Sequence, residues 1–419
     1  MTAGMSQTRK RRMSLGLRGR LLGTMAVAAA WCVGFVGAAS SAVAADVQAK
    51  QWYLKAMHAE EMWKVTTGEG IKVAVIDTGV NSSTPSLKGQ VLKGFDATGA
   101  DGDEYDDYRG HGTTMAELIA GTGKGGGLQG LAPGAKIIPM RITDTEFQNE
   151  HSVNAHDSED AIRAAADSDA QIISMAFGSD FPGREEREAV KYARSKGKLF
   201  FAGVGNNAKK GNKEQFPASY PQVVGVAATD SNGKVSTYSQ HGDAVDIAAP
   251  GDGIPTWCDA KFQGYCDSEG GTSQATAITS ASAALIWSAH PDWTANQVLN
   301  VLFDTAGRGD WEKGTLSNYL GHGIIRPAVN ILKGKGNPGA PDISPLTKEK
   351  TSGSSASPAP SAPASSQPEK KEKADDAVVA GSSKEKDDGS PLGLIIGGAA
   401  AVVVLGGGAF ALVRKRRTA

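Results

Sequence analysis

The chain has 419 residues, a formal net charge of -1 at pH 7 and an isoelectric point of about 6.7. This length allows a domain with a large apolar core, and the balanced charge excludes a strongly basic protein that binds nucleic acid through its overall field. Three cysteines are too few for a small fold held together mainly by disulfides.

Residues 1–44 have the pattern of a signal peptide. Basic residues at 9–12 precede an apolar run at 21–39, and the sequence AVA at 42–44 forms a small-residue cleavage site. We therefore predict that this segment, including Cys32, is removed and that the remaining chain leaves the cytoplasm. The paired arginines within 9–12 leave both the general secretory and the twin-arginine export route open.

The other end of the chain has the composition of a linker followed by a membrane anchor. Residues 335–390 are rich in Pro, Ser, Ala and charged residues, so we predict a disordered tether. Residues 391–413 are apolar and uncharged and are long enough to span a bilayer as one helix. Residues 414–419 are basic and should stay in the cytoplasm, which places the folded domain outside a single-pass cell membrane protein.

Between these ends, residues 45–334 form the predicted folded domain, in which apolar runs of strand length alternate with helical patterns. Continuous apolar strands separated by helices predict an α/β domain with a doubly wound, mainly parallel sheet and helices on both faces. The predicted strands are 72–76, 137–142, 172–177, 199–204 and 223–227, and two predicted helices are 159–166 and 184–195. Functional sites in such sheets lie at the carboxyl ends of the strands.

Two side chains near predicted strand and helix ends are suited to acid–base chemistry. Asp77 closes the run 72–76, where a carboxylate can orient a histidine; a helix cap or a turn is the alternative role. His111 lies between glycines in the motif RGHGTT, which leaves room for a substrate, whereas a lone histidine is usually structural.

A serine and an asparagine complete this set of candidate residues. Ser273 lies in the motif GGTSQA, at the start of a run of small residues that predicts a tight turn and a closely packed helix. The N–H groups and dipole of such a helix terminus can stabilise an oxyanion. Asn206 follows another apolar run and can donate its side-chain amide, although an Asx turn is the alternative.

Together these residues resemble the motifs of the subtilisin-like serine proteases, or subtilases, because Asp, His and Ser follow the chain order of that family. The resemblance covers about residues 52–332. It implies that Ser273 is the nucleophile, His111 the general base and then acid, and Asp77 the group that orients the imidazole. It also implies that Asn206 binds the oxyanion and that catalysis requires no cofactor.

The same resemblance implies where a polypeptide substrate binds. Two segments match the strand edges on which the family lays an extended peptide, which would pair with them as an added strand. Their residues are Ala176, Phe177, Gly178, Ala202, Gly203 and Val204. The motifs at 216–221 and 246–251 resemble structural motifs of the family.

Some features differ from the common subtilase pattern. Gln274 and Ala277 replace residues that are usual after the serine, but neither change removes a catalytic group. The stretch between residue 45 and the first strand is too short for the globular propeptide of secreted subtilisins. The short leader, the tether and the apolar C-terminal segment resemble the mycosins, which are membrane-anchored subtilases of type VII secretion systems in actinobacteria. This resemblance implies association with a secretion-system membrane complex.

An acidic run and two cysteines admit structural roles. The acidic residues are Asp101, Asp103, Glu104, Asp106 and Asp107. They can bind a structural calcium ion or favour basic substrates, but we expect a solvated loop and predict no metal site.

Cys258 and Cys266 remain once the signal peptide is removed, and outside the cell we expect them to form a disulfide that fixes the loop before Ser273.

The sequence therefore predicts a membrane-anchored extracellular serine endopeptidase that cleaves polypeptides through an acyl-enzyme. The alternative, from another functional class, is a non-hydrolytic scaffold that uses the same fold to bind within a secretion complex. An esterase is less well supported, because the serine does not lie in a Gly-x-Ser-x-Gly motif.

Overall fold

The computed structural model describes residues 47–151 and 157–351. The chain divides into two compact units, residues 1–361 and 362–419, and all described residues belong to the first. In these described ranges no helix is both long and apolar enough to cross a bilayer. The predicted signal peptide, apolar span and basic tail lie outside the described residues.

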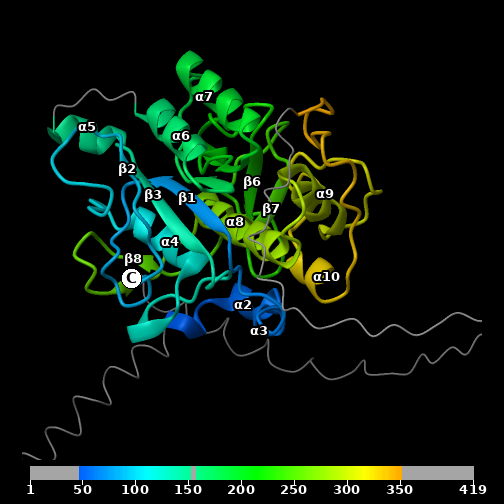
Figure 1. The fold of residues 1–419 in the computed structure, drawn as a ribbon, viewed down its shortest axis with the longest axis horizontal. Helices are drawn as coiled ribbons and strands as arrows, with labels where there is room; N and C mark the ends of the chain where they lie inside the picture. The colour runs from blue at the N-terminus through cyan, green and yellow to red at the C-terminus, as the bar shows by residue number, and fades with distance from the viewer. Residues whose placement is uncertain (1–46, 152–156, 352–419) are drawn as a thin grey trace, which may run out of the picture. The chain divides into compact units, whose positions relative to one another are not determined.

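Seven parallel strands form the central sheet, in the order β2-β3-β1-β4-β5-β6-β7 (Figure 1). The strands are β1 Lys72–Asp77, β2 Phe95–Asp96, β3 Lys136–Arg141, β4 Ile172–Met175, β5 Leu199–Gly203, β6 Val224–Thr229 and β7 Ile247–Pro250. The chain leaves β1 toward β2 and β3 on one side and continues through β4 to β7 on the other, so the sheet is doubly wound as predicted. The strand order reverses at β1, which is where ligands bind in sheets of this kind.

Helices cover both faces of this sheet, which confirms the predicted arrangement. Successive residues of a strand point to opposite faces, so Val73 and Val75 join one apolar core while Ala74 and Ile76 join the other. The first core contains α4 His111–Ala120, α8 Thr272–Ala289 and α9 Ala295–Thr305, and the second contains α6 Ser158–Asp167 and α7 Arg184–Ser195. Figure 1 shows α6 and α7 lying together on their side of the sheet.

The remaining elements are short. They are α2 Trp52–Ala56, α3 Ala59–Met62, α5 Thr145–His151, α10 Pro327–Ile331, the 3₁₀ turns η1 Lys124–Gly126 and η2 Ala208–Lys210, and the hairpin of β8 Thr256–Trp257 and β9 Tyr265–Cys266. The predicted disulfide between Cys258 and Cys266 is present in this hairpin. The described structure also extends to residue 351, past the predicted domain boundary at 334, because residues 337–351 bond to α9.

Helix α8 packs closely against the sheet because its contact face is made of small side chains. Ala275, Ala277 and Ala281 are completely buried. The buried hydroxyl groups of Thr276, Thr279 and Ser282 each donate to the carbonyl four residues earlier, at 2.7 to 2.8 Å, so they cost little to bury. A Cβ atom at Gly203 would lie 2.8 Å from Oγ1 of Thr272. Only glycine at this place lets the first turn of α8 reach the end of β5.

Candidate active site

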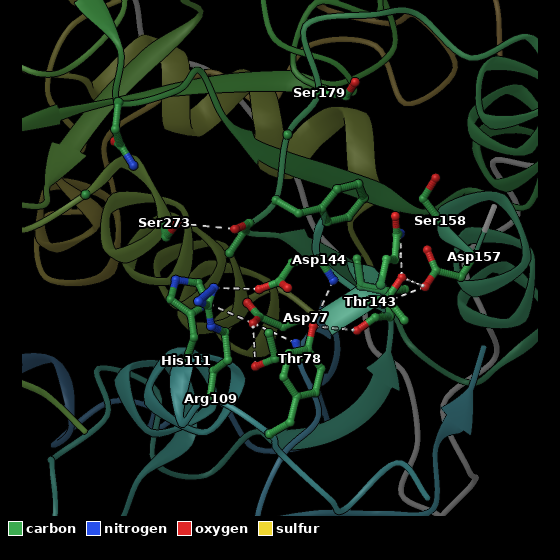
Figure 2. Close-up of a pocket in the computed structure, with 18 of the residues that line it drawn as sticks. Asp77, Thr78, Arg109, His111, Thr143, Asp144, Asp157, Ser158, Ser179 and Ser273 are labelled. Carbon is green, nitrogen blue, oxygen red and sulfur yellow. Dashed lines mark hydrogen bonds and ion pairs between the residues drawn. The ribbon is translucent and has the colours of Figure 1, made fainter. Parts of the chain in front are cut away.

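The predicted site residues meet at the carboxyl edge of the parallel sheet. Asp77 is the last residue of β1, Ala176 follows β4, and Asn206 follows β5. The first turns of α4 and α8 bring His111 and Ser273 to the same edge. All five residues line one cavity of about 950 Å³ (Figure 2). The topology therefore brings together side chains that lie far apart in the sequence.

Asp77 is a buried carboxylate that faces the imidazole of His111. Its side chain is 2% exposed, and Oδ1 lies 2.7 Å from Nδ1 of His111. The same oxygen accepts a hydrogen bond from the backbone N–H of Thr78 at 2.8 Å. Because a carboxylate can only accept, Nδ1 carries the proton in this contact and the Nε2 lone pair of the neutral ring remains available.

His111 is the first residue of α4 and is held by the turn before it. Gly110 has a φ of 80°, a conformation that favours glycine. Burial by itself lowers the pKa of the His111 imidazole. The charge and hydrogen bond of Asp77 and the charge of Asp107 together raise it by more than burial lowers it, so the pKa lies above its ordinary value of 6.5. The ring is 36% exposed and lines the cavity, so its free nitrogen can exchange a proton with a bound molecule.

Asp107 fixes the start of α4, a role that the sequence analysis missed. Its Oδ1 accepts hydrogen bonds from the N–H groups of Arg109 at 3.0 Å and Gly110 at 2.8 Å and from the Thr78 hydroxyl at 2.7 Å. Its Oδ2 accepts from the N–H of Thr113 at 2.8 Å and from the Thr113 hydroxyl at 2.6 Å. The expected solvated loop is therefore wrong for this residue. No sequence signal identifies it, because the residue directly before the helix, where a capping side chain is expected, is Gly110.

The other acidic residues of that run have separate surroundings. Asp101, Asp103 and Asp106 are exposed, whereas Glu104 is 9% exposed and accepts from the N–H of Gly94 at 3.0 Å. Across residues 47–151 and 157–351, no group of three or more His, Cys, Asp or Glu side chains is arranged to hold a metal ion.

Ser273 is the second residue of α8, the central helix of the fold. Its hydroxyl donates to the carbonyl oxygen of Ala176 at 3.3 Å (Figure 2), and the side chain is partly exposed in the cavity. Gly270, with a φ of 97°, makes the turn into the helix. The free N–H groups of the first helical turn create a positive potential that suits a negatively charged oxygen.

The side chain of Asn206 is oriented by the residue before Ser273. Its Oδ1 accepts from the backbone N–H of Thr272 at 2.9 Å and from the Thr272 hydroxyl at 3.1 Å. A backbone N–H can only donate, so the amide oxygen must face Thr272 and the Nδ2 donor must point the other way. Asn206 is exposed and lines the cavity, which makes this donor available to a bound group.

The two predicted substrate segments differ in their surroundings. Ala176, Phe177 and Gly178 line the cavity, as expected for a peptide-binding edge. Ala202 and Gly203 instead lie within β5, and Val204 follows directly after them; all three are buried. β5 pairs with β4 on one side and β6 on the other, so neither edge is open to an added strand. For these three residues the expected pairing with a peptide as an added strand is wrong.

Several residues that the sequence analysis did not select also line the cavity. Arg109 pairs with Asp144 at 2.6 Å and with Glu146, and Asp157 accepts a hydrogen bond from the Thr143 hydroxyl at 2.7 Å. Burial raises the pKa of Asp157. The cavity wall also includes Trp257, Glu159, Glu185 and Glu186. Arg109, Asp144 and Asp157 lie on loops, whereas the glutamates lie in the first turns of α5, α6 and α7. No sequence pattern connects residues of such different segments, so only the fold reveals that they share this wall.

Comparisons with known proteins agree with this geometry. Residues 68–323 match the model of the Subtilase family. Thermitase from Thermoactinomyces vulgaris is 33% identical over 280 residues, which are 64% of this chain and 95% of thermitase. Subtilisin E from Bacillus subtilis (strain 168) is 33% identical over 57% of this chain, and the match covers 61% of subtilisin E.

Solved structures give the same result for the fold. MycP1 from Mycobacterium smegmatis superimposes with a TM-score of 0.58 at 26% identity and covers 71% of this chain and 88% of its own. MycP3, described as a protease from the type VII (ESX-3) secretion system, has a TM-score of 0.55 at 30% identity and covers 66% of this chain and 87% of its own. The predicted likeness to mycosins is thus confirmed. The chain belongs to the subtilase family and is a serine endopeptidase.

Proposed function

We propose that this endopeptidase acts through Asp77, His111 and Ser273 as a catalytic triad. The observation that carries the proposal is the 2.7 Å contact between the buried carboxylate of Asp77 and Nδ1 of His111, in a cavity that Ser273 also lines. A carboxylate that holds Nδ1–H leaves Nε2 free to take the proton of a serine hydroxyl, which is the division of roles in a Ser-His-Asp triad.

The proposed reaction begins with attack of Ser273 Oγ on the carbonyl carbon of the scissile peptide bond while His111 Nε2 takes the hydroxyl proton. The negative charge that develops on the carbonyl oxygen is stabilised by Nδ2 of Asn206 and the N–H groups at the start of α8. His111 then gives its proton to the leaving amine, and the acyl group remains on Ser273. Water hydrolyses this ester with His111 as base, which restores the enzyme.

An extended polypeptide is the proposed substrate, and residues 176–178 are its proposed docking edge. This segment follows β4 and lines the cavity, so a peptide laid along it places a carbonyl beside Ser273. The carbonyl of Ala176 already accepts from Ser273. That contact shows how near this edge lies to the proposed nucleophile.

The experiment uses the full-length chain in detergent, a fluorogenic peptide library and a serine-directed phosphonate. We expect peptide cleavage and covalent labelling of the wild type, with both lost in the Ser273→Ala variant. Labelling that persists in Ser273→Ala, or a folded wild type that neither cleaves nor reacts, would contradict the proposal.

We further propose that the enzyme is exported, held in the cell membrane by residues 391–413, and associated with a secretion complex. The apolar segment with its basic flank supports the anchor. MycP1, a structural neighbour, is described as an essential component of the type VII (ESX-1) secretion system. If secretion continues in the Ser273→Ala variant but stops when the gene is deleted, the result would support a second, non-hydrolytic function as a scaffold within the secretion complex.

A further inference from the structure

Glu117 is a buried carboxyl group in the helix that begins at His111. It lies among apolar residues of α4 and is completely buried. One carboxyl oxygen accepts from the Thr84 hydroxyl at 2.9 Å and the other from the Tyr265 hydroxyl at 2.6 Å. Burial raises the pKa of Glu117 to about 7. Because a buried carboxyl group is costly for stability, its presence here needs an explanation other than core packing.

Tyr265 connects this carboxyl group to the disulfide-closed hairpin, residues 256–266. In the hairpin Tyr265 pairs with Trp257, and the two rings stack with centroids 3.9 Å apart. The Tyr265 hydroxyl also accepts from the N–H of Leu128 at 3.3 Å. The disulfide joins the residues that follow Trp257 and Tyr265. A hydrogen bond at Tyr265 therefore restrains the hairpin as one body.

The hairpin is at once a wall of the active-site cavity and a support for the turn before His111. Thr256 and Trp257 line the cavity, and the N–H of Trp257 donates to the hydroxyl of Thr114 in α4 at 3.1 Å. At Gly110 a Cβ atom would lie 2.8 Å from the carbonyl oxygen of Asp259 and 3.1 Å from Cβ of Trp257. The hairpin thus packs directly against the backbone that carries the imidazole.

We infer that Glu117 is a positioning residue that, through Tyr265, holds the disulfide-closed hairpin against the turn before His111 and so sets both the imidazole and the Trp257 wall of the cavity. The inference rests on the proposed function, because the effect on catalysis requires His111 to be the general base. Glu117 itself touches neither substrate nor reacting atoms; its effect reaches the cavity through the Tyr265 side chain and the hairpin.

Three substitutions separate this role from simple packing. Glu117→Ala leaves the hydroxyls of Thr84 and Tyr265 without the acceptor that holds them, so the hairpin is free to shift. Glu117→Gln keeps the length and provides an oxygen and an N–H for the same two partners. Tyr265→Phe keeps the stacked ring and removes only the hydroxyl. Because a displacement of about 1 Å can cost about 100-fold in rate, small movements of the hairpin become measurable.

The first measurement is kcat/KM on the peptide that the wild type cleaves best, expressed per active site titrated with the phosphonate. We expect a decrease of about 10- to 100-fold for Glu117→Ala, a smaller decrease for Tyr265→Phe, and values within about threefold of wild type for Glu117→Gln. Titration removes the effect of unfolded protein, so a purely structural residue would leave this quantity unchanged.

Asp246 provides a matched control, because burial also raises the pKa of its carboxyl group to about 7. It accepts from the N–H of Gly225 at 2.8 Å and precedes β7, at the opposite end of the sheet from the cavity. Asp246→Ala should lower stability without changing kcat/KM per titrated site. Wild-type kcat/KM in Glu117→Ala, or an equal decrease in Asp246→Ala, would overturn the inference.

Amide hydrogen exchange tests the same contact without relying on activity. In Glu117→Ala we expect faster exchange both in residues 256–266 and in residues 108–114, and wild-type rates there in Glu117→Gln. Unchanged exchange in 108–114 would overturn the inference even if the enzyme were inactive. If the wild type neither cleaves peptides nor reacts with the phosphonate, but the variants show the expected exchange pattern, only the proposed function is contradicted.

Discussion

At the scale of single residues, Asn206 uses its two amide atoms for different tasks. Its oxygen is bonded to Thr272, so only Nδ2 is free for a substrate oxygen. Asn206→Asp keeps an acceptor for Thr272 and removes the donor. We expect kcat to fall by about 100- to 1,000-fold with little change in KM, because the lost contact forms only as charge develops. Steady-state kinetics on one good peptide measure this. An unchanged kcat would remove Asn206 from the proposed oxyanion site.

The charges around His111 predict the acid limb of the pH profile. A protonated imidazole cannot take the proton of Ser273, so kcat/KM should fall as pH decreases through the raised pKa, above 6.5. Asp107 raises this pKa and Arg109 lowers it. Asp107→Asn should therefore move the acid limb to lower pH, and Arg109→Gln should move it to higher pH.

The opposite directions of these two shifts make the test specific. Profiles of kcat/KM against pH at constant ionic strength give the midpoints, and Arg163→Gln, on the outer helix α6, provides a control for loss of a positive charge. Shifts of the same sign in Asp107→Asn and Arg109→Gln would contradict the assignment of the limb to His111.

The sequence was informative where a residue lies in a short motif and less so where its role depends on distant contacts. Asp77, His111, Asn206 and Ser273 each end or follow a strand or lie in the first turn of a helix, so their meeting at one edge of a parallel sheet could be predicted. Asp107 could not be separated from its acidic neighbours, because only the fold shows which carboxylate turns inward.

At the scale of secondary-structure elements, length and continuity decided what could be predicted. β1 and β3 to β6 are continuous apolar runs, and each was predicted within one or two residues. β2 has two residues and the paired strands of the hairpin are equally short. Segments of this length are too short to show the periodic pattern of apolar residues from which a strand is predicted. β7 was assigned only to a structural motif. The expected pairing of residues 202–204 with a peptide strand was wrong, because a sequence does not show whether both edges of a strand are already paired.

The hairpin allows a prediction about stability at this scale. Cys258 and Cys266 enclose a short loop, and their disulfide should stabilise the fold by about 2 to 3 kcal/mol through restriction of the unfolded chain. The double variant Cys258→Ser, Cys266→Ser should unfold at a lower temperature, and a reducing agent should have the same effect on the wild type. Calorimetry with and without reductant checks this. A reductant that lowered the melting temperature of the double variant equally would show that the disulfide is not the cause.

At the scale of the whole molecule, the sequence and the structure inform different parts of the chain. The fold and the site lie within residues 47–351, where strands and helices pack on one sheet. The export signal and the anchor are predicted from composition and charge order alone. Proposed cleavage therefore rests on geometry, whereas the proposed location rests on the thermodynamics of transfer into a bilayer.

Membrane attachment is the prediction that belongs to this scale. Transfer of an uncharged segment as long as residues 391–413 into the bilayer hydrocarbon is far more favourable in free energy than binding of a protein to the membrane surface. The full chain should therefore resist alkaline carbonate extraction. Deletion of 391–419 should release an active enzyme, whereas deletion of 360–385, within the tether, should leave it attached. Fractionation followed by phosphonate labelling measures location and active sites together. A full-length chain that alkaline carbonate extracts would contradict the anchor while leaving the chemistry of the site untouched.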